Sequence, residues 1–258
     1  MKWQDCERLD QSDVLRTIFY PRPDLSPDDE QTVRFQVADD IALGGRFHPA
    51  AKDAPVILLF HGNGEIAADY DTFVPLYLKI GVSLLVVDYR GYGKSGGTPT
   101  FSALLEDAVS VYRQMHKGLS DHGYEVKRLF IMGRSLGSAA AIEIAVQAGD
   151  GINGLIIESG FASGFRLMKR LGGISLAELD EDKCGLNNAG KLERVKVPTL
   201  IIHGEEDTII PFEAGETLYR RCGSEKKTFL AIPGAGHNDL LYVAHREYFR
   251  AIEKLVSG

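Results

Sequence analysis

The chain of 258 residues is 44% hydrophobic and 25% charged, with 28 Gly and 10 Pro. These proportions are ordinary for a globular protein and exclude a disordered, collagen-like or fibrous chain. The net charge of −7 argues against a nucleic-acid partner, because phosphate binding needs a basic surface. No apolar run approaches the ~20 residues of a membrane span, and the start lacks the apolar core of a signal peptide. We therefore expect no membrane span and a cytoplasmic location.

The cysteines argue against a disulfide framework and against a zinc site. Cys6, Cys184 and Cys222 are odd in number and show no Cys-x-x-Cys spacing. No cluster of His, Asp and Glu has the spacing of metal ligands either. The sequence therefore predicts neither a metal nor another cofactor.

In chain order, two alternating segments come first, Thr32–Val37 and Ile41–Phe47, and they predict an antiparallel hairpin. Continuous apolar runs follow, as expected for strands that are covered on both faces. These runs are Val56–Phe60, Ser83–Val87, Leu129–Met132, Leu155–Ile157, Thr199–Ile202 and Thr228–Ile232. Helical patterns lie between or after them at Phe101–Met115, Ser138–Val146, Ala214–Arg220 and Tyr242–Val256. This alternation predicts one α/β domain over residues 1–258, a doubly wound, mostly parallel sheet with antiparallel N-terminal edge strands.

Residues 161–197 interrupt the alternation, since a crossover helix needs only about a dozen residues. The surplus predicts a small lid with helices near Phe161–Leu171 and Ser175–Asp182, split by Gly172-Gly173. An ordinary crossover with a long surface loop is the alternative. The apolar side chains of the segment suit an acyl group or packing against the sheet: Phe161, Phe165, Leu167, Met168 and Leu171.

A Gly-x-Ser-x-Gly sequence joins a predicted strand to a predicted helix: Gly133-Arg134-Ser135-Leu136-Gly137. A serine at the tip of so sharp a turn is held in strained geometry, and the flanking glycines remove clashes between strand and helix. Its hydroxyl then stands beside a helix N-terminus, where negative charge is favoured. We interpret Ser135 as a nucleophile. Similar letters at Gly173-Ile174-Ser175-Leu176-Ala177 have no strand before them.

A serine nucleophile needs a general base within hydrogen-bond reach. His237 follows the last predicted strand, and the two glycines before it allow the loop to bring its imidazole over Ser135. His245 lies within the terminal helical pattern and is expected at the surface or in packing. The other histidines that follow no strand are His48, His116 and His122. His237 is therefore the candidate base.

A carboxylate must orient that base. Asp207 ends the turn HGEED after the strand Thr199–Ile202, and the following Thr-Ile-Ile-Pro would anchor its backbone. Glu158, just after another predicted strand, is the alternative. Glu205 and Glu206 are expected to face solvent. We therefore take Asp207 as the candidate acid.

Backbone donors for an oxyanion are predicted after an early strand. Val56–Phe60 ends in His61-Gly62-Asn63-Gly64, a turn that exposes backbone N–H groups. A tetrahedral intermediate needs two donors aimed at its oxygen. We expect the amides of Asn63 and Leu136 to supply them, with Gly64 as the alternative first donor.

Five motifs in chain order resemble those of the α/β-hydrolase superfamily: HGNG, DYRGYGKSGG, GRSLG, HGEEDTIIP and GAGHND. The resemblance covers residues 32–258. It is closest to compact bacterial serine hydrolases similar to the serine aminopeptidases and the depalmitoylase-like hydrolases. It implies Ser135 as nucleophile, Asp207 as acid and His237 as base. Asp88 stands where a phosphate-binding loop needs its first glycine, which argues against a nucleotide site.

These motifs predict a serine hydrolase that cleaves a carboxylic ester or thioester of a small acyl substrate through an acyl-enzyme. A serine peptidase or amidase of the same fold is the alternative. It would need an acidic residue at the substrate's amino group, for which Glu65 and Glu158 are available. A hydrolase-fold protein that binds without catalysis should have lost a triad or oxyanion element, and none is missing from this sequence.

Overall fold

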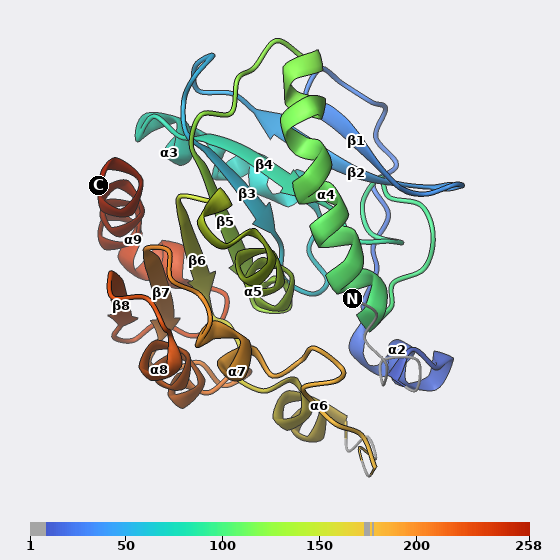
Figure 1. Ribbon diagram of the computed structural model, residues 1–258, viewed down its shortest axis with the longest axis vertical. Coiled ribbons are helices and arrows are strands. Elements are labelled where there is room, and N and C mark those ends of the chain that lie inside the picture. The colour runs from blue at the N-terminus through green and yellow to red at the C-terminus, as the bar shows by residue number, and fades with distance from the viewer. Residues whose placement is uncertain (1–8, 173–175, 177) are drawn as a thin grey trace.

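The protein is described by a computed structural model over residues 9–172, 176 and 178–258 (Figure 1). An eight-stranded sheet runs through its centre in the order β1-β2-β4-β3-β5-β6-β7-β8. The strands are β1 Thr32–Ala38, β2 Ile41–His48, β3 Val56–Phe60, β4 Ser83–Val87, β5 Leu129–Arg134, β6 Gly154–Glu158, β7 Thr199–Gly204 and β8 Lys227–Ile232. β1 and β2 pair antiparallel at one edge and β2 joins β4 antiparallel, whereas β3 to β8 are parallel to their neighbours. This confirms the predicted fold class.

Helices cover both faces of the sheet. The α-helices are α2 Ser12–Ile18, α3 Val74–Lys79, α4 Phe101–Asp121, α5 Gly137–Ala148, α6 Gly164–Gly172, α7 Asn188–Leu192, α8 Phe212–Arg221 and α9 Leu240–Ser257. Short 3-10 turns are η1 Ala67–Thr72 and η2 Gly149–Gly151. α4 and α5 lie on one face and α3 and α9 on the other (Figure 1). None of the helices in the described ranges is both long and apolar enough to cross a bilayer.

The sheet is buried on both faces, which explains its continuous apolar runs. In β3, Leu58 and Phe60 pack into the core on the α4–α5 side. Ile57 and Leu59 pack into the core on the α3–α9 side. All five residues of β3 and of β4 are buried. A strand with one wet face would alternate polar residues at these positions.

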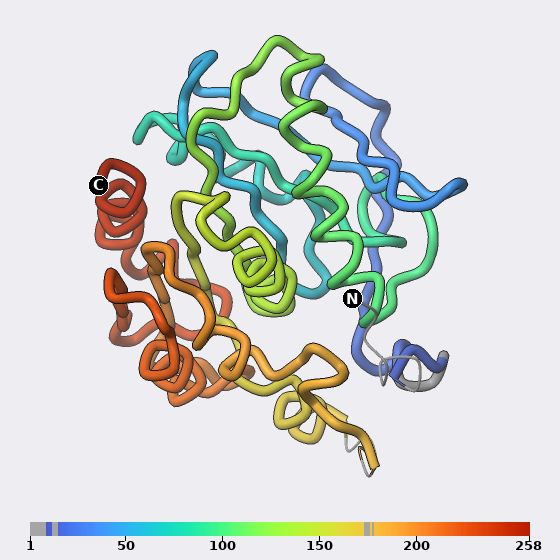
Figure 2. Tube along the Cα trace, viewed as in Figure 1, coloured from blue at the N-terminus to red at the C-terminus, as the bar shows by residue number. Residues whose placement is uncertain are grey.

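The parallel strands bring several loops to one edge of the sheet. The carboxyl ends of β3, β5, β6, β7 and β8 meet there, as they must in a parallel sheet. α2 contacts α6 at this same edge, and the two segments lie close together in Figure 2. A methyl group on Gly172 would come within 2.7 Å of the Thr17 side chain. The N-terminal segment and the predicted lid therefore border the edge together.

The predicted lid segment is helical in its first part and not in its second. α6 corresponds to the helix expected near 161–171. The second helix expected at Ser175–Asp182 is wrong for residues 178–182, which form turns and irregular backbone. Residues 173–175 and 177 lie outside the described residues, and they include most of the sequence Gly173-Ile174-Ser175-Leu176-Ala177. The Asp180 carboxylate accepts the Asp182 backbone N–H at 2.9 Å, and such local bonds compete with a helix. The next helix is α7, capped by Asn187.

Candidate active site

The elbow, residues 133–137, turns sharply from β5 into α5. Ser135 has a φ of 51°, in the left-handed region that a residue other than glycine adopts only when the surrounding structure constrains it. A Cβ atom on Gly133 would lie 2.3 Å from the Gly137 carbonyl oxygen, and one on Gly137 would lie 2.0 Å from the Phe60 carbonyl oxygen. The Ser135 backbone N–H donates to the Glu158 carbonyl at 2.9 Å. Strand and helix can therefore approach this closely only with glycine at both positions.

The structure brings the three predicted triad residues together from three loops. Ser135 Oγ lies 2.9 Å from His237 Nε2, and His237 Nδ1 lies 2.7 Å from Asp207 Oδ2. All three side chains are buried. His237 belongs to the histidine loop, residues 233–239, which joins β8 to α9. This arrangement can pass a proton from the serine hydroxyl to a ring whose far side faces a carboxylate.

Asp207 is held as an anion by its loop. Its Oδ1 accepts the backbone N–H groups of Ile209 and Ile210 at 2.9 and 2.8 Å. Burial opposes ionisation, but hydrogen bonds from His203, His237 and the Ile210 backbone hold the pKa of this carboxyl well below its usual value. A carboxylate that stays charged and oriented can stabilise a histidine cation.

The oxyanion loop, residues 61–65 after β3, carries the predicted first donor. In the described part of the chain, the backbone N–H groups of Asn63 and Leu136 donate to no protein acceptor, so both are available. The Asn63 side chain points elsewhere, since its Oδ1 accepts the Tyr20 backbone N–H at 3.1 Å and the Tyr92 hydroxyl at 2.6 Å. Asn63 therefore also binds the N-terminal segment at Tyr20.

The other acidic residues considered for the triad lie away from the base. Glu158 bonds Arg134 Nε at 3.1 Å and the Tyr248 hydroxyl. Glu205 and Glu206 are exposed. Of the carboxylates considered, Asp207 is thus the one in contact with His237.

The other histidines also lie elsewhere. His245 is exposed on α9, and His48 contacts Asp71 at the end of β2. His116 and His122 belong to α4 and its C-terminal cap. None of these rings has a contact with Ser135 among the described hydrogen bonds.

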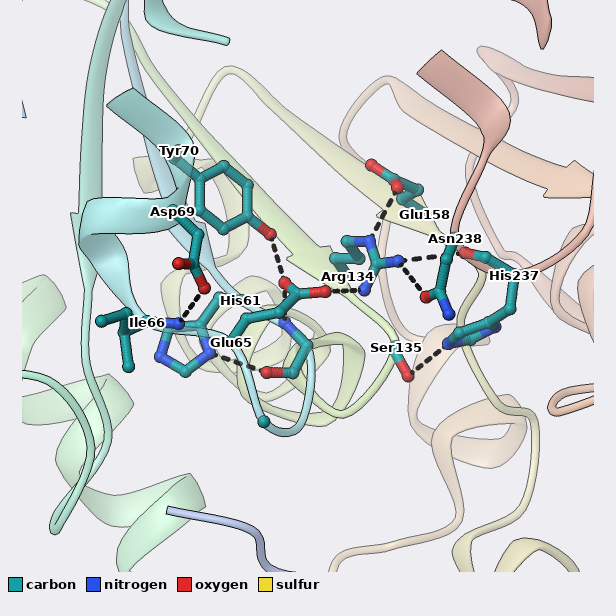
Figure 3. A network of polar contacts seen from close by, with 12 residues as sticks. His61, Glu65, Ile66, Asp69, Tyr70, Arg134, Ser135, Glu158, His237 and Asn238 are labelled. Atoms are coloured by element: carbon teal, nitrogen blue, oxygen red, sulfur yellow. Dashed lines mark hydrogen bonds and ion pairs between the residues drawn. The ribbon is translucent and has the colours of Figure 1, made fainter. Parts of the chain in front are cut away.

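A network centred on Arg134 was missed from the sequence (Figure 3). Its guanidinium contacts Glu65, Glu158, the His237 carbonyl oxygen at 3.0 Å and Asn238 Oδ1 at 2.8 Å. Burial would lower the pKa of Arg134, but the carboxylates of Glu158 and Glu65 hold it above its usual value. A charged residue directly before the serine was the signal that could have revealed the network.

Two cavities lie near the triad, and Ser135, Asp207 and His237 line neither of them. The first, of about 530 Å³, begins at Ile210 beside Asp207 and extends between α6 and α8. Its apolar lining residues are Phe161, Ala162, Leu167, Ile210, Pro211 and Ala214. The second, of about 410 Å³, lies between the oxyanion and histidine loops and reaches Asn63, Arg134 and Asn238.

Of the predicted lid side chains, Phe161 and Leu167 line the first cavity, whereas Met168 is buried in the core and Leu171 is exposed. The segment thus contributes side chains both to the cavity and to the core. In the described ranges, no group of three His, Cys, Asp or Glu side chains could hold a metal ion. Cys184 and Cys222 are buried, and Cys6 lies outside the described residues.

Comparison with known proteins gives a family. The family model described as "Serine aminopeptidase, S33" matches residues 51–174 and 187–241. These matched residues include the oxyanion loop, the elbow, Asp207 and His237.

Curated relatives match over most of the chain. The uncharacterized protein YfhR of Escherichia coli K12 is 29% identical over 92% of this chain and 84% of its own. The human alpha/beta hydrolase domain-containing protein 17B is 28% identical over 82% of this chain and 69% of its own. The solved structure of the Pyrococcus furiosus esterase Pf2001 has a TM-score of 0.73 at 19% identity, over 92% of this chain and 98% of that chain. At that identity the structural likeness supports the fold.

Proposed function

The chain belongs to the serine aminopeptidase family of α/β-hydrolases, and from that premise we propose that this hydrolase cleaves carboxylic esters or thioesters with Ser135, His237 and Asp207. The observation that carries the proposal is the continuous contact from Ser135 Oγ through the His237 ring to the Asp207 carboxylate. Pf2001, the structural neighbour, is named an esterase, which agrees with the reaction class.

In the proposed reaction, His237 Nε2 takes the proton of Ser135 as the hydroxyl oxygen attacks the acyl carbonyl. Asp207 keeps the other ring proton on Nδ1 and stabilises the cation. The backbone N–H groups of Asn63 and Leu136 receive the oxyanion. His237 then protonates the leaving alcohol or thiol, and water repeats the sequence on the acyl-enzyme to release the acid.

The two cavities suggest which half of the substrate lies where. We assign the acyl group to the first cavity, because Phe161, Leu167 and Ile210 give it an apolar wall. Charged side chains also line this cavity: Arg166, Arg170, Glu213 and Arg221. We assign the leaving group to the second cavity, because the oxyanion loop and Asn238 border it with polar groups. A volume of about 530 Å³ suits short to medium acyl chains.

The peptidase alternative depends on two carboxylates that line the second cavity, Glu65 and Glu158. A peptidase of this family type would need a carboxylate for the substrate's amino group. Glu65 and Glu158 both contact Arg134, and each also accepts a tyrosine hydroxyl. The single charge of Arg134 balances only one of these two carboxylates, so a net negative charge remains at the second cavity and amide substrates belong in the test.

The test is hydrolysis of a p-nitrophenyl ester series from acetate to long chains, with fluorophosphonate labelling of the serine. We expect Ser135→Ala to lower turnover by about 10⁴- to 10⁶-fold and to abolish labelling, with an unchanged melting temperature. Ester turnover that survives in Ser135→Ala contradicts the proposal. Labelling without ester turnover moves the substrate to amides.

The cavity assignment has its own test. Leu167→Trp should fill the acyl cavity and move the optimum to shorter acyl chains. Leu241→Trp, in the second cavity, is the matched control and should change the preference for the alcohol at a fixed acyl chain. If Leu167→Trp alters only the alcohol preference, the two cavities are assigned the wrong way round.

A further inference from the structure

One side chain connects the loops that the proposed reaction depends on. Arg134 directly precedes Ser135, and its guanidinium lies between Glu65, Glu158 and Asn238 (Figure 3). Its side chain is 12% exposed and that of Glu158 is 6% exposed. Charge-assisted hydrogen bonds in so dry a place are strong and fix geometry.

On one side the guanidinium holds the oxyanion loop. Its Nη1 contacts Glu65 Oε1, while Glu65 Oε2 accepts the backbone N–H of Gly62 and the Tyr70 hydroxyl, both at 2.8 Å. A Cβ atom on Gly62 would lie 2.5 Å from Arg134 Nη1 and 2.8 Å from Glu65 Oε1, so a side chain there would displace one of these two groups. Asn63, the proposed donor, is the next residue of the loop.

On the other side the guanidinium holds the histidine loop. Its Nη2 donates to the His237 carbonyl oxygen at 3.0 Å and to Asn238 Oδ1 at 2.8 Å. Its Nε donates to Glu158, whose backbone carbonyl receives the N–H of Ser135 at 2.9 Å. The Arg134 guanidinium is thus linked to the Ser135 backbone through Glu158 and to the His237 backbone directly. Through Glu65 it is linked to Gly62, the residue before Asn63.

Arg134 itself contacts no reacting atom. Ser135 Oγ bonds His237 Nε2, on the ring, whereas Arg134 bonds the backbone of that histidine. We infer that Arg134 is a positioning residue, which sets the distance between the Asn63 N–H and the His237 ring. This inference rests on the proposed function. A displacement of about 1 Å in such groups can lower turnover by about 10²-fold.

A second buried arginine supplies the matched control. Arg90 donates to both oxygens of Asp107, at 2.6 and 2.7 Å, and its side chain is 21% exposed. The pair joins the loop after β4 to α4 and contacts neither the triad nor the oxyanion loop. Arg90→Met therefore removes a bidentate ion pair of one arginine and one carboxylate without touching the proposed machinery.

The experiment compares Arg134→Met, Arg134→Lys and Arg90→Met by kcat and KM on p-nitrophenyl butyrate, fluorophosphonate labelling rate and melting temperature. We expect Arg134→Met to lower kcat and the labelling rate by about 10- to 100-fold, with KM within about threefold. Arg134→Lys keeps the charge but loses the planar guanidinium that bonds several groups at once. Its kcat and labelling rate should lie between those of wild type and Arg134→Met. Arg90→Met should keep both rates within about threefold at a comparable loss of melting temperature.

Equal rate losses in Arg134→Met and Arg90→Met, or a loss confined to KM, overturn the inference and leave the proposed function standing. Failure of the wild-type protein to label overturns both. If Arg134→Met does not fold, Glu65→Gln takes its place, since it keeps the volume of Glu65 and removes the charge. A kcat of Glu65→Gln equal to wild type then also overturns the inference.

Discussion

The pairs His237–Asp207 and His61–Asp88 lie at the same edge of the sheet, and all four side chains are buried. In the first, ring and carboxylate are 2.7 Å apart, and the other ring nitrogen meets Ser135 Oγ. In the second, the closest approach is 3.4 Å, and His61 Nδ1 contacts the Gly62 carbonyl of its own loop at 2.8 Å. The His237 ring can therefore exchange a proton with the Ser135 hydroxyl. The His61 ring instead contacts the backbone of its own loop.

The two aspartates differ in the same way. Asp207 uses one oxygen for its own loop amides and turns the other to His237. Asp88 gives its oxygens to the backbone N–H groups of Ala67 and Lys94, at 2.7 and 3.3 Å. The two His–Asp pairs have the same residue types and are both buried, so neither property identifies the pair that can act on a substrate. The two pairs differ in the group that the second ring nitrogen and the second carboxylate oxygen contact.

The strongest way to sharpen this contrast is Asp207→Asn. The variant keeps the shape but places an amide where the His237 Nδ1 proton needs an acceptor, so turnover should fall by about 10³- to 10⁴-fold. Steady-state kinetics on a p-nitrophenyl ester measures the loss, with the melting temperature as control for folding. Turnover within tenfold of wild type would show that another carboxylate serves His237.

The same replacement in the second pair, Asp88→Asn, should act on stability. It weakens the acceptors for Ala67 and Lys94, so we expect the free energy of unfolding to fall by about 1–3 kcal/mol. Turnover should stay within about threefold of wild type. Urea denaturation and ester kinetics on one preparation check both. A turnover loss comparable to that of Asp207→Asn would break the comparison.

The smallest effect concerns pH. Because the pKa of Asp207 is lower in the folded protein than its usual 3.8, its ionisation stabilises the fold above that pH, and the contribution is lost as the pH falls further. Urea denaturation between about pH 5 and pH 3 should therefore show a steeper loss for wild type than for Asp207→Asn. Asp24, Asp28 and Asp29, whose pKa values are also lowered, are common to both proteins and cancel. Parallel slopes would contradict the assignment.

The sheet was largely predictable, because burial on both faces forces continuous apolar runs. β3 and β4 begin and end where the sequence predicts. α3 was missed, since six residues with Pro75 near its start are too short to show a period. Of the helix expected at Ser175–Asp182, the described residues 178–182 are not helical, and the next helix is α7, because Asp180 and Asn187 bind nearby backbone amides in turns and caps.

The triad was predictable for a local reason: each member follows a strand within a short motif. Arg134 and Glu65 were not, because their contact joins loops 69 positions apart and no local pattern encodes it. The role of the Asn63 side chain was not predicted for the same reason, since its partner Tyr20 lies 43 positions away. Short sequence motifs therefore predicted the triad, whereas the ion pair between Arg134 and Glu65 became visible only in the structure.

The wide spacing of the triad also has a consequence for synthesis. Ser135 precedes its base by 102 positions, and the elbow and histidine loop meet only after β8 and α9 join the sheet. At about 5–20 residues per second, the ribosome delivers the serine about 5 to 20 s before the histidine. A nascent chain therefore carries the hydroxyl without a partner to take its proton. The onset of hydrolysis would then report that the last strand and helix have docked.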